Sequence, residues 1–125
     1  MEQRRQAKME YKQSLRPMGV WAIHNRENGK HFVLGTMNLP ASMNRHRFDL
    51  RLGSHINKAL QQDWNTYGAE AFDFTVLEEV KPREEPQPLK VYQDEVKLLM
   101  ELWLEKLQPY GEQGYNNPAE KARII

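Results

Sequence analysis

Two short stretches near the start of the chain carry a pattern of apolar and polar residues that predicts a pair of strands. Residues 18–25 read MGVWAIHN and residues 30–36 read KHFVLGT, and both are rich in strand-forming residues but too short for a stable helix. Asn28-Gly29 between them is typical of tight hairpin turns, because both residues accept positive φ angles. The pattern therefore predicts an antiparallel hairpin over 18–25 and 30–36.

The next stretch has the apolar spacing of a helix and signals for both of its ends. Asn38 suits the position before a helix, Pro40 suits the first turn, and Gly53 suits the end, so we expect a helix over 39–52. At about 100° per residue, one narrow stripe of this helix faces the core. That stripe contains Leu39, Met43, His46 and Leu50.

A second helix and a third strand follow. Ser54 is a candidate cap for the helix and Gly68 a candidate terminator. The apolar residues at helical spacing between them are Ile56, Leu60 and Trp64. Residues 71–79, AFDFTVLEE, alternate apolar and polar side chains and predict a strand.

The last third of the chain predicts one long helix after a proline-rich connection. Residues 81–90 contain three prolines and predict a linker or extended loop. Residues 91–107 have helical spacing, and Pro109 follows their end. The predicted core side of this helix contains Tyr92, Val96, Leu99, Trp103 and Leu107. The order β-β-α-α-β-α predicts an α/β chain of the α+β kind, with a small three-stranded antiparallel sheet flanked by helices.

Length and composition indicate one soluble domain. A chain of 125 residues can bury a single sizeable core. Cysteine is absent, which excludes disulfides and thiol chemistry and suits a reducing compartment. The first residues have no apolar segment of signal-peptide length, and no stretch approaches a membrane span. We therefore expect a cytoplasmic protein without a membrane partner; the oligomeric state is not readable from the sequence.

Charge is divided unevenly along the chain. Residues 1–62 hold eleven Lys and Arg against four Asp and Glu, whereas residues 63–125 hold seven against thirteen. The halves therefore carry +7 and −6, although the net charge is only +1. This division suits a basic face that meets phosphate groups, and it equally suits an unevenly charged solvated surface.

The order of elements and several specific segments resemble the GIY-YIG nuclease domain. GVWAIHN and NGKHFVLG stand where that family has its two signature triplets, in altered form. The block from Asn44 to Glu79 is similar to the family's helix pair and third strand, and LWLEKLQPYGEQGYN is similar to its closing helix and Gly-Tyr-Asn ending. The resemblance implies a domain over residues 18–117, preceded by a basic, possibly helical extension (1–17) and followed by a tail (118–125).

Members of this family cut DNA with one divalent metal ion, and the resemblance implies where their working residues fall. A tyrosine relays a proton from water, an arginine holds the phosphate, and a glutamate on the last helix binds the metal. The tyrosine positions fall on Trp21 and on Phe32 (Val33 in another register), the arginine on Ser42, and the glutamate on Leu98. The family's two histidines and its terminal asparagine match His46, His55 and Asn116.

The residue types at these positions favour a binding module over an enzyme, because the proton relay, the phosphate-binding arginine and the metal ligand are replaced. Trp21 and Phe32 then have a simpler interpretation as core aromatics, His46 as a half-buried polar residue and His55 as a polar residue at a helix start. The expected DNA contacts are Lys30, Arg45, Arg47, Arg51 and Lys58, assisted by the basic N-terminus.

Two other functions remain open at this stage. One is an active endonuclease with a rearranged site, in which Arg45 replaces the arginine and Asp94, Glu95 or Glu101 replaces the metal ligand. The other is a protein-interaction module that uses the acidic last helix. The binding module needs no cofactor, whereas the endonuclease needs Mg²⁺ or Mn²⁺.

Overall fold

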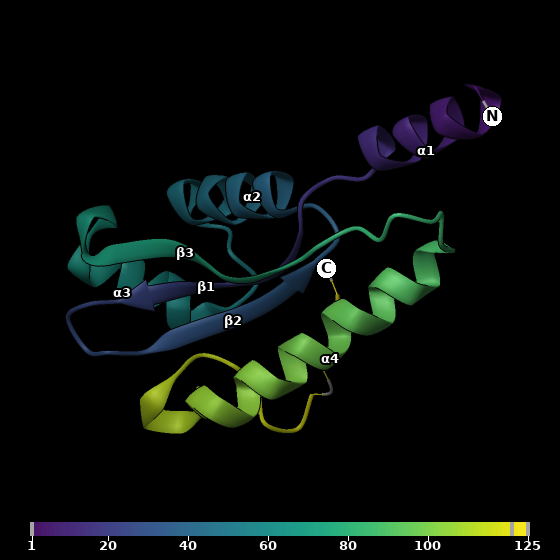
Figure 1. Ribbon diagram of the computed structural model, residues 1–125. Coiled ribbons are helices and arrows are strands. Elements are labelled where there is room, and N and C mark those ends of the chain that lie inside the picture. The colour runs from purple at the N-terminus through teal and green to yellow at the C-terminus, as the bar shows by residue number, and fades with distance from the viewer. Residues whose placement is uncertain (1, 121, 125) are drawn as a thin grey trace.

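The computed structural model describes residues 2–120 and 122–124 of the chain. The main elements are listed here in chain order (Figure 1): α1 (Glu2–Ser14), β1 (Met18–Asn25), β2 (His31–Thr36), α2 (Leu39–Leu52), α3 (Lys58–Tyr67), β3 (Phe72–Val80) and α4 (Leu89–Leu107). Two short 3₁₀ turns, Ala69–Ala71 and Gly111–Gln113, precede β3 and follow α4. Within the described ranges, no helix combines the length and apolar character needed to cross a membrane.

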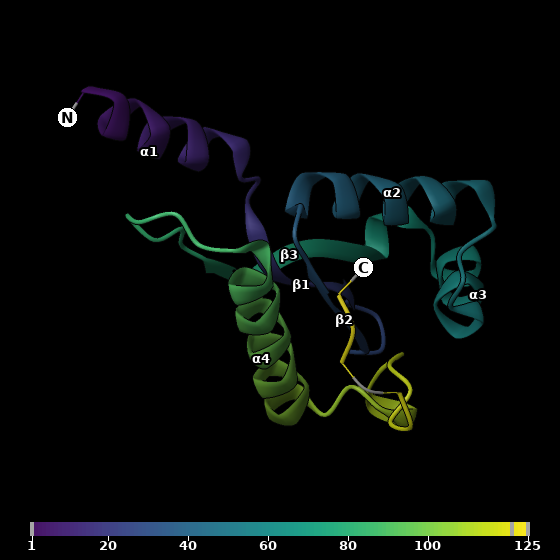
Figure 2. The ribbon, with the colours of Figure 1, turned by 90° about the vertical axis from the view of Figure 1, so that its right-hand side faces the viewer.

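The three strands form one antiparallel sheet with β1 in the middle, in the order β2-β1-β3. The hairpin register runs from Gly19 opposite Thr36 to His24 opposite His31, and Gly29 adopts the positive φ angle that the turn requires. In both ribbon views α2 lies above the sheet and α4 below it (Figures 1 and 2). The predicted α+β fold is therefore confirmed, with a helical layer on each face of the sheet.

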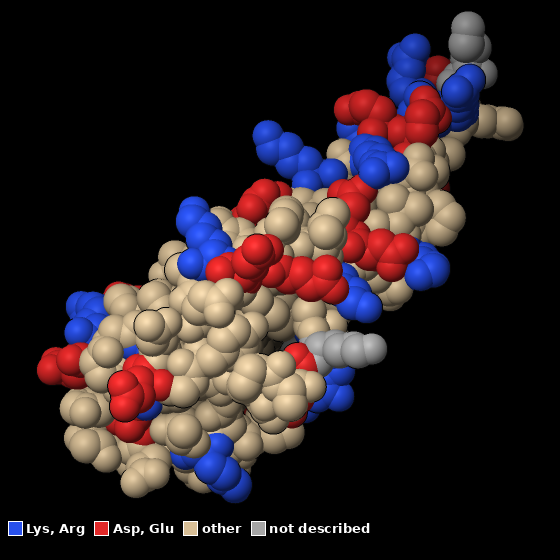
Figure 3. Space-filling view, turned by 90° about the horizontal axis from the view of Figure 1, so that it is seen from below, with Lys and Arg blue, Asp and Glu red and all other residues tan. Residues whose placement is uncertain are grey.

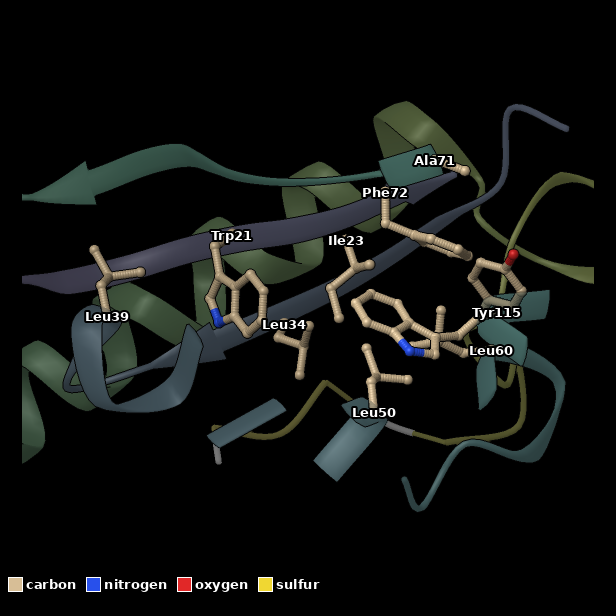
Figure 4. Close-up of a cluster of buried hydrophobic side chains, with 10 residues drawn as sticks. Trp21, Ile23, Leu34, Leu39, Leu50, Leu60, Ala71, Phe72 and Tyr115 are labelled. Carbon is tan, nitrogen blue, oxygen red and sulfur yellow. The ribbon is translucent and has the colours of Figure 1, made fainter. Parts of the chain in front are cut away.

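Side chains of β1 point alternately into two cores because successive residues of a strand face opposite sides. Trp21 and Ile23 pack on the side of α2 and α3, together with Leu60 of α3 (Figure 4). Trp64 of α3 belongs to the same cluster. Val20 and Ala22 pack on the side of α4. The alternation therefore places the predicted site residue Trp21 on the α2 side of the sheet.

Helix α2 has the predicted bounds. The Asn38 side chain accepts a hydrogen bond from the backbone of Ala41, and Gly53 ends the helix in the left-handed conformation. The buried face differs slightly from the predicted stripe, because Ser42 is buried and Met43 is only partly buried. His46 lies on the buried face, as predicted.

Helix α3 begins later than predicted, and Ser54 is not its cap. The Asn57 side chain accepts a hydrogen bond from the backbone of Leu60, so the helix starts at Lys58. Ile56 therefore precedes the helix and is 82% exposed, contrary to its predicted place on the core face. The physical reason is that the Asn57 side chain accepts a hydrogen bond from the N–H of Leu60, one of the first N–H groups of the helix, which have no partner within it.

Helix α4 begins at Leu89, two residues before the predicted start at 91. Its buried residues are Tyr92, Val96, Met100 and Leu104. Leu99, Trp103 and Leu107 were predicted to face the core and are partly buried beside it. In the second half of the helix, the buried face is therefore centred one residue later in the sequence than the predicted stripe.

The N-terminal residues form a helix that scarcely contacts the sheet. No residue of α1 is buried, although Tyr11 packs against the hydrophobic core. Lys8 and Lys12 form ion pairs with Glu85 and Glu84 in the loop before α4. Positive and negative side chains are intermixed at this end of the molecule (Figure 3).

The C-terminal residues cover the edge of β2. The backbone of Tyr115 donates a hydrogen bond to His31, and Gly35 forms an isolated parallel bridge with Ile124. Ala122 is buried against the core on the α4 side. Lys121 and Ile125 of the predicted tail lie outside the described residues. The covered edge cannot pair with another chain at these positions.

Candidate functional site

Trp21 and Ser42 meet in the core between the sheet and α2. The Trp21 indole is fully buried, and its Nε1–H donates a hydrogen bond of 3.0 Å to Ser42 Oγ. The same indole packs edge-on against the His46 ring, with ring centres 5.4 Å apart. Strand β1 and helix α2 thus bring together two of the predicted positions.

His46 and His55 form a hydrogen-bonded pair, with His46 Nδ1 2.8 Å from His55 Nε2. His55 Nδ1 accepts a hydrogen bond from the backbone N–H of Asn57, so the neutral His55 ring carries its proton on Nε2. His55 therefore donates to His46. Phe32 of β2 packs edge-to-face against both imidazole rings.

Both imidazoles are held in the neutral form. The pKa of His46 is lowered to about 4, chiefly because the ring is buried and to a smaller extent because His55 lies beside it. Burial also lowers the pKa of His55. The nearby carboxylate of Asp49 raises both pKa values, but burial has the larger effect, so neutral imidazole is the stable form at pH 7.

Gln61 is a site-supporting residue that sequence reasoning missed. Its Oε1 accepts a hydrogen bond from the backbone of His55, and its Nε2 donates to the carbonyl of Leu50. These bonds fix the segment between α2 and α3 that carries His55. The available signal was a polar residue directly beside Leu60 on the apolar stripe of α3, which is unusual unless the residue has a buried partner.

Asn116 lies apart from the histidine pair, on the outer edge of β2. Its side chain accepts a hydrogen bond of 2.8 Å from the backbone N–H of Val33 and donates one of 3.0 Å to the Val33 carbonyl. Both polar ends of the amide are thus used to attach the C-terminal segment to the strand. The structure gives Asn116 a structural role at this edge.

The predicted metal position, Leu98, is not part of this cluster. Leu98 lies two residues from both Val96 and Met100, about 200° around the helix, and is 56% exposed. It therefore points away from the sheet. The α4 residues that face a cavity beside β2 are Met100 and Leu104.

The residues at this place do not fit a magnesium ion. Mg²⁺ prefers oxygen ligands, and Met100, Leu104 and Val33 provide none. Among the described residues that line the cavity, only Glu120 carries a carboxylate. The substitutes proposed from sequence lie elsewhere: Glu95 pairs with Arg83, and Glu101 is exposed on α4. In residues 2–120 and 122–124 no group of three or more His, Cys, Asp or Glu side chains is arranged to hold a metal ion.

The basic residues expected to contact DNA divide into two groups. Arg45 and Arg51 on α2 and Lys58 at the start of α3 are exposed. Arg47 lies over the Phe74 ring at 4.5 Å, and Lys30 lies over the Tyr115 ring at 5.5 Å. The first group is therefore available to a partner, while the second also stabilises aromatic side chains.

Comparisons with known proteins give one consistent result at the level of structure. No protein-family model matches the chain, and no curated protein matches it. The catalytic domain of homing endonuclease I-TevI is similar over 82% of this chain and 99% of its own, with a TM-score of 0.64 and 27% identity. A mutant of the catalytic domain of intron endonuclease I-TevI is similar over 87% of this chain and 99% of its own, with a TM-score of 0.63 and 25% identity.

These neighbours agree with the arrangement of the sheet, the helix pair and the closing helix described above. I-TevI is a GIY-YIG nuclease, and its catalytic domain is spanned almost completely by the match. The resemblance predicted from the sequence is therefore confirmed, and the chain has the fold of the GIY-YIG nuclease family.

Proposed function

We propose that this domain binds DNA and has lost most or all of the cleavage activity of its fold family. The observation that carries the proposal is the buried cluster of Trp21, Ser42, His46 and His55. Its hydrogen bonds run from Trp21 to Ser42 and between the two histidines, with no ionised group among them. The cluster thus has a structural role, and it contains neither a charged group that could bind a phosphate nor a strong base.

The chemistry of these groups explains the proposed loss of cleavage. A general base works best when its pKa lies near the working pH, and the pKa of His46 is about 4. Its Nδ1 is already engaged with His55. The hydroxyl of Ser42 carries no charge with which to stabilise a phosphate that gains negative charge.

DNA binding is supported by exposed cations and by the structural neighbours. Arg45, Arg51 and Lys58 are exposed on the helix pair, and none of the three forms an ion pair with another residue of 2–120 or 122–124. Such cations bind the DNA backbone without reading its sequence and release counterions as they do so. Both structural neighbours are endonuclease catalytic domains.

A rearranged endonuclease site has less support from the geometry. Glu101 lies on α4 below the sheet, while Arg45 lies on α2 above it. Glu95 is engaged by Arg83. With Glu95 already paired and Glu101 exposed, no contact of either carboxylate points to a metal site, so the alternative has less support.

Salt-dependent duplex binding tests the first half of the proposal. If three to five cations contact phosphates, the logarithm of the affinity should fall with the logarithm of salt concentration at a slope of roughly −3 to −4.5. Reversing the charges of Arg45, Arg47 and Arg51 together should remove most of the binding. The matched control reverses Lys90, Lys97 and Lys106 on α4 and should change the affinity little. Equal losses in the two triple variants would refute a binding face on α2.

Plasmid nicking tests the second half. The parent protein should leave supercoiled plasmid intact with Mg²⁺ or Mn²⁺, as it does with chelator. A variant carrying Trp21→Tyr, Phe32→Tyr, Ser42→Arg and Met100→Glu should nick slowly in Mg²⁺, provided that circular dichroism shows it folded. The matched variant replaces Met100→Glu with Leu98→Glu and should not nick. Chelator-sensitive nicking by the parent itself would overturn the proposed loss of activity.

A further inference from the structure

A cavity of about 390 Å³ lies between β2, the start of α3, α4 and the C-terminal segment. Its volume falls in the range of pockets that hold small organic molecules, roughly 300–1,000 Å³. The apolar part of its wall comes from Phe32, Val33, Leu34, Met100, Leu104 and Ala122. This wall suits a planar, largely apolar group.

Two tyrosines and several amides complete the wall. Tyr110 and Tyr115 line the cavity, and the Tyr115 hydroxyl donates a hydrogen bond of 2.6 Å to Asp63. Asn57 also lines it, and its side chain donates to the Tyr115 carbonyl at 2.7 Å. These bonds hold Tyr115 and the start of α3 in place, so this part of the wall is preformed.

The rim of the cavity carries more positive than negative charge. Lys58 and Arg123 line it, together with Glu120, which is the one acidic residue among the described residues that line the cavity. Within the described residues, neither Lys58 nor Arg123 takes part in an ion pair. A ligand with an anionic group next to an apolar, planar group would match this distribution.

We propose that the cavity binds a single nucleotide, with the base against the apolar wall and the phosphate between Lys58 and Arg123. An uncharged apolar ligand would leave the two cations without a role, and a phosphate alone would leave the apolar wall exposed. Aromatic side chains and Arg are the groups that proteins use to hold unpaired bases.

The inference deepens the proposed DNA binding, because Lys58 belongs both to the helix pair and to the cavity rim. The nucleotide has two possible sources: a free mononucleotide, or an unpaired nucleotide of a bound strand. Extruding a paired base costs a few kcal/mol, so a strand end or gap is a better donor than intact duplex. Both sources present the same base and phosphate to the cavity. They differ in whether the nucleotide is free or part of a DNA strand.

Calorimetric titration of the full chain with deoxyadenosine monophosphate tests the cavity directly. The nucleotide should bind at least 10-fold more tightly than deoxyadenosine or inorganic phosphate, because only the nucleotide uses both parts of the site. Lys58→Ala and Arg123→Ala should each weaken nucleotide binding several-fold and leave deoxyadenosine unaffected. Ala122→Phe, which fills the apolar part, should weaken both ligands. Lys90→Ala on α4 is the matched charge control.

Two results would overturn the proposal. One is a nucleotide that binds no more tightly than phosphate, which would reduce the rim to an ordinary anion contact. The other is unchanged nucleotide affinity in both Lys58→Ala and Ala122→Phe, each checked for folding by circular dichroism. If the protein binds the nucleotide but does not bind duplex DNA, the result would support nucleotide binding by the cavity and refute only the proposed DNA-binding function.

A fluorescent base separates the two sources. A 2-aminopurine placed in a single-stranded overhang should change its fluorescence on binding if the cavity takes a nucleotide from DNA. Ala122→Phe should abolish that change while leaving the affinity for blunt duplex intact. Mononucleotide binding without any overhang signal would assign the cavity to free nucleotides, which still supports the site.

Discussion

Two regions beside the sheet treat polar groups in opposite ways. Between the sheet and α2, Ser42, His46 and His55 are buried, and each is hydrogen-bonded to another protein group. At the outer edge of β2, between the start of α3 and α4, a cavity has a largely apolar wall and is also lined by the cations Lys58 and Arg123. One region is therefore closed, with its polar groups paired, and the other is an open cavity.

The buried cluster shows how this fold can be stable without a charged group in its core. A buried polar cluster is stable when every donor and acceptor is paired and no charge is desolvated. Among the described residues, no buried side-chain polar atom lacks a partner. The buried cluster thus needs no charged group to be stable. Substitutions inside the cluster and substitutions outside it should therefore have effects of very different size.

Removing the Trp21 indole should produce the largest effect. Trp21→Ala deletes a fully buried ring that contacts Ser42, His46 and Phe74, and should lower the free energy of unfolding by about 3–5 kcal/mol. Denaturant unfolding measures the loss. Leu98→Ala, on the outer face of α4, is the control and should cost less than about 0.5 kcal/mol. Similar losses in both variants would contradict the assignment of the two faces.

Acidification should produce the next largest effect, through the histidine pair. The pKa of His46 in the folded protein, about 4, lies below its ordinary value of 6.5. The folded state therefore favours neutral imidazole, and this contribution is present above pH 6.5 and lost as pH falls toward 4. Stability should drop by up to about 2–3 kcal/mol across that window.

The pH dependence can be assigned to this residue by substitution. His46→Gln should lower stability at pH 7 and reduce the dependence between pH 6.5 and 4; burial also lowers the pKa values of His55 and His31, so part of the dependence should remain. Leu98→Ala, on the outer face of α4, is the control and should keep the full dependence. A curve for His46→Gln as steep as that of the parent would show that another group is responsible.

Removing the Ser42 hydroxyl should produce the smallest of these effects. Ser42→Ala leaves the buried Trp21 N–H without its acceptor and should cost about 1–2 kcal/mol. Thermal or denaturant unfolding measures the loss. Ser54→Ala is the matched control, because Ser54 is exposed and should contribute almost nothing. A cost at Ser42 no greater than at Ser54 would mean that the hydrogen bond does not stabilise the core.

The sequence by itself determined the parts of the fold that depend on neighbouring residues. Asn28-Gly29 specifies the hairpin turn, and Asn38 with Gly53 specifies both ends of α2, because turns and caps are made within a few residues. The long similarity of the middle segment to the GIY-YIG domain, together with this local structure, was sufficient for the overall fold. The convergence of Trp21, Ser42, His46 and His55 was also implied by the resemblance.

The tertiary structure decided which of several locally reasonable choices applies. Ser54 and Asn57 are both good helix caps, and only the docking of the chain selects Asn57. Leu98 and Met100 are both apolar residues of α4, and only the packing of the helix on the sheet turns Met100 toward the cavity. The cavity itself joins residues from β2, α3, α4 and the C-terminal segment. Contacts between such distant segments leave no local pattern, because they depend on how the helices pack against the sheet.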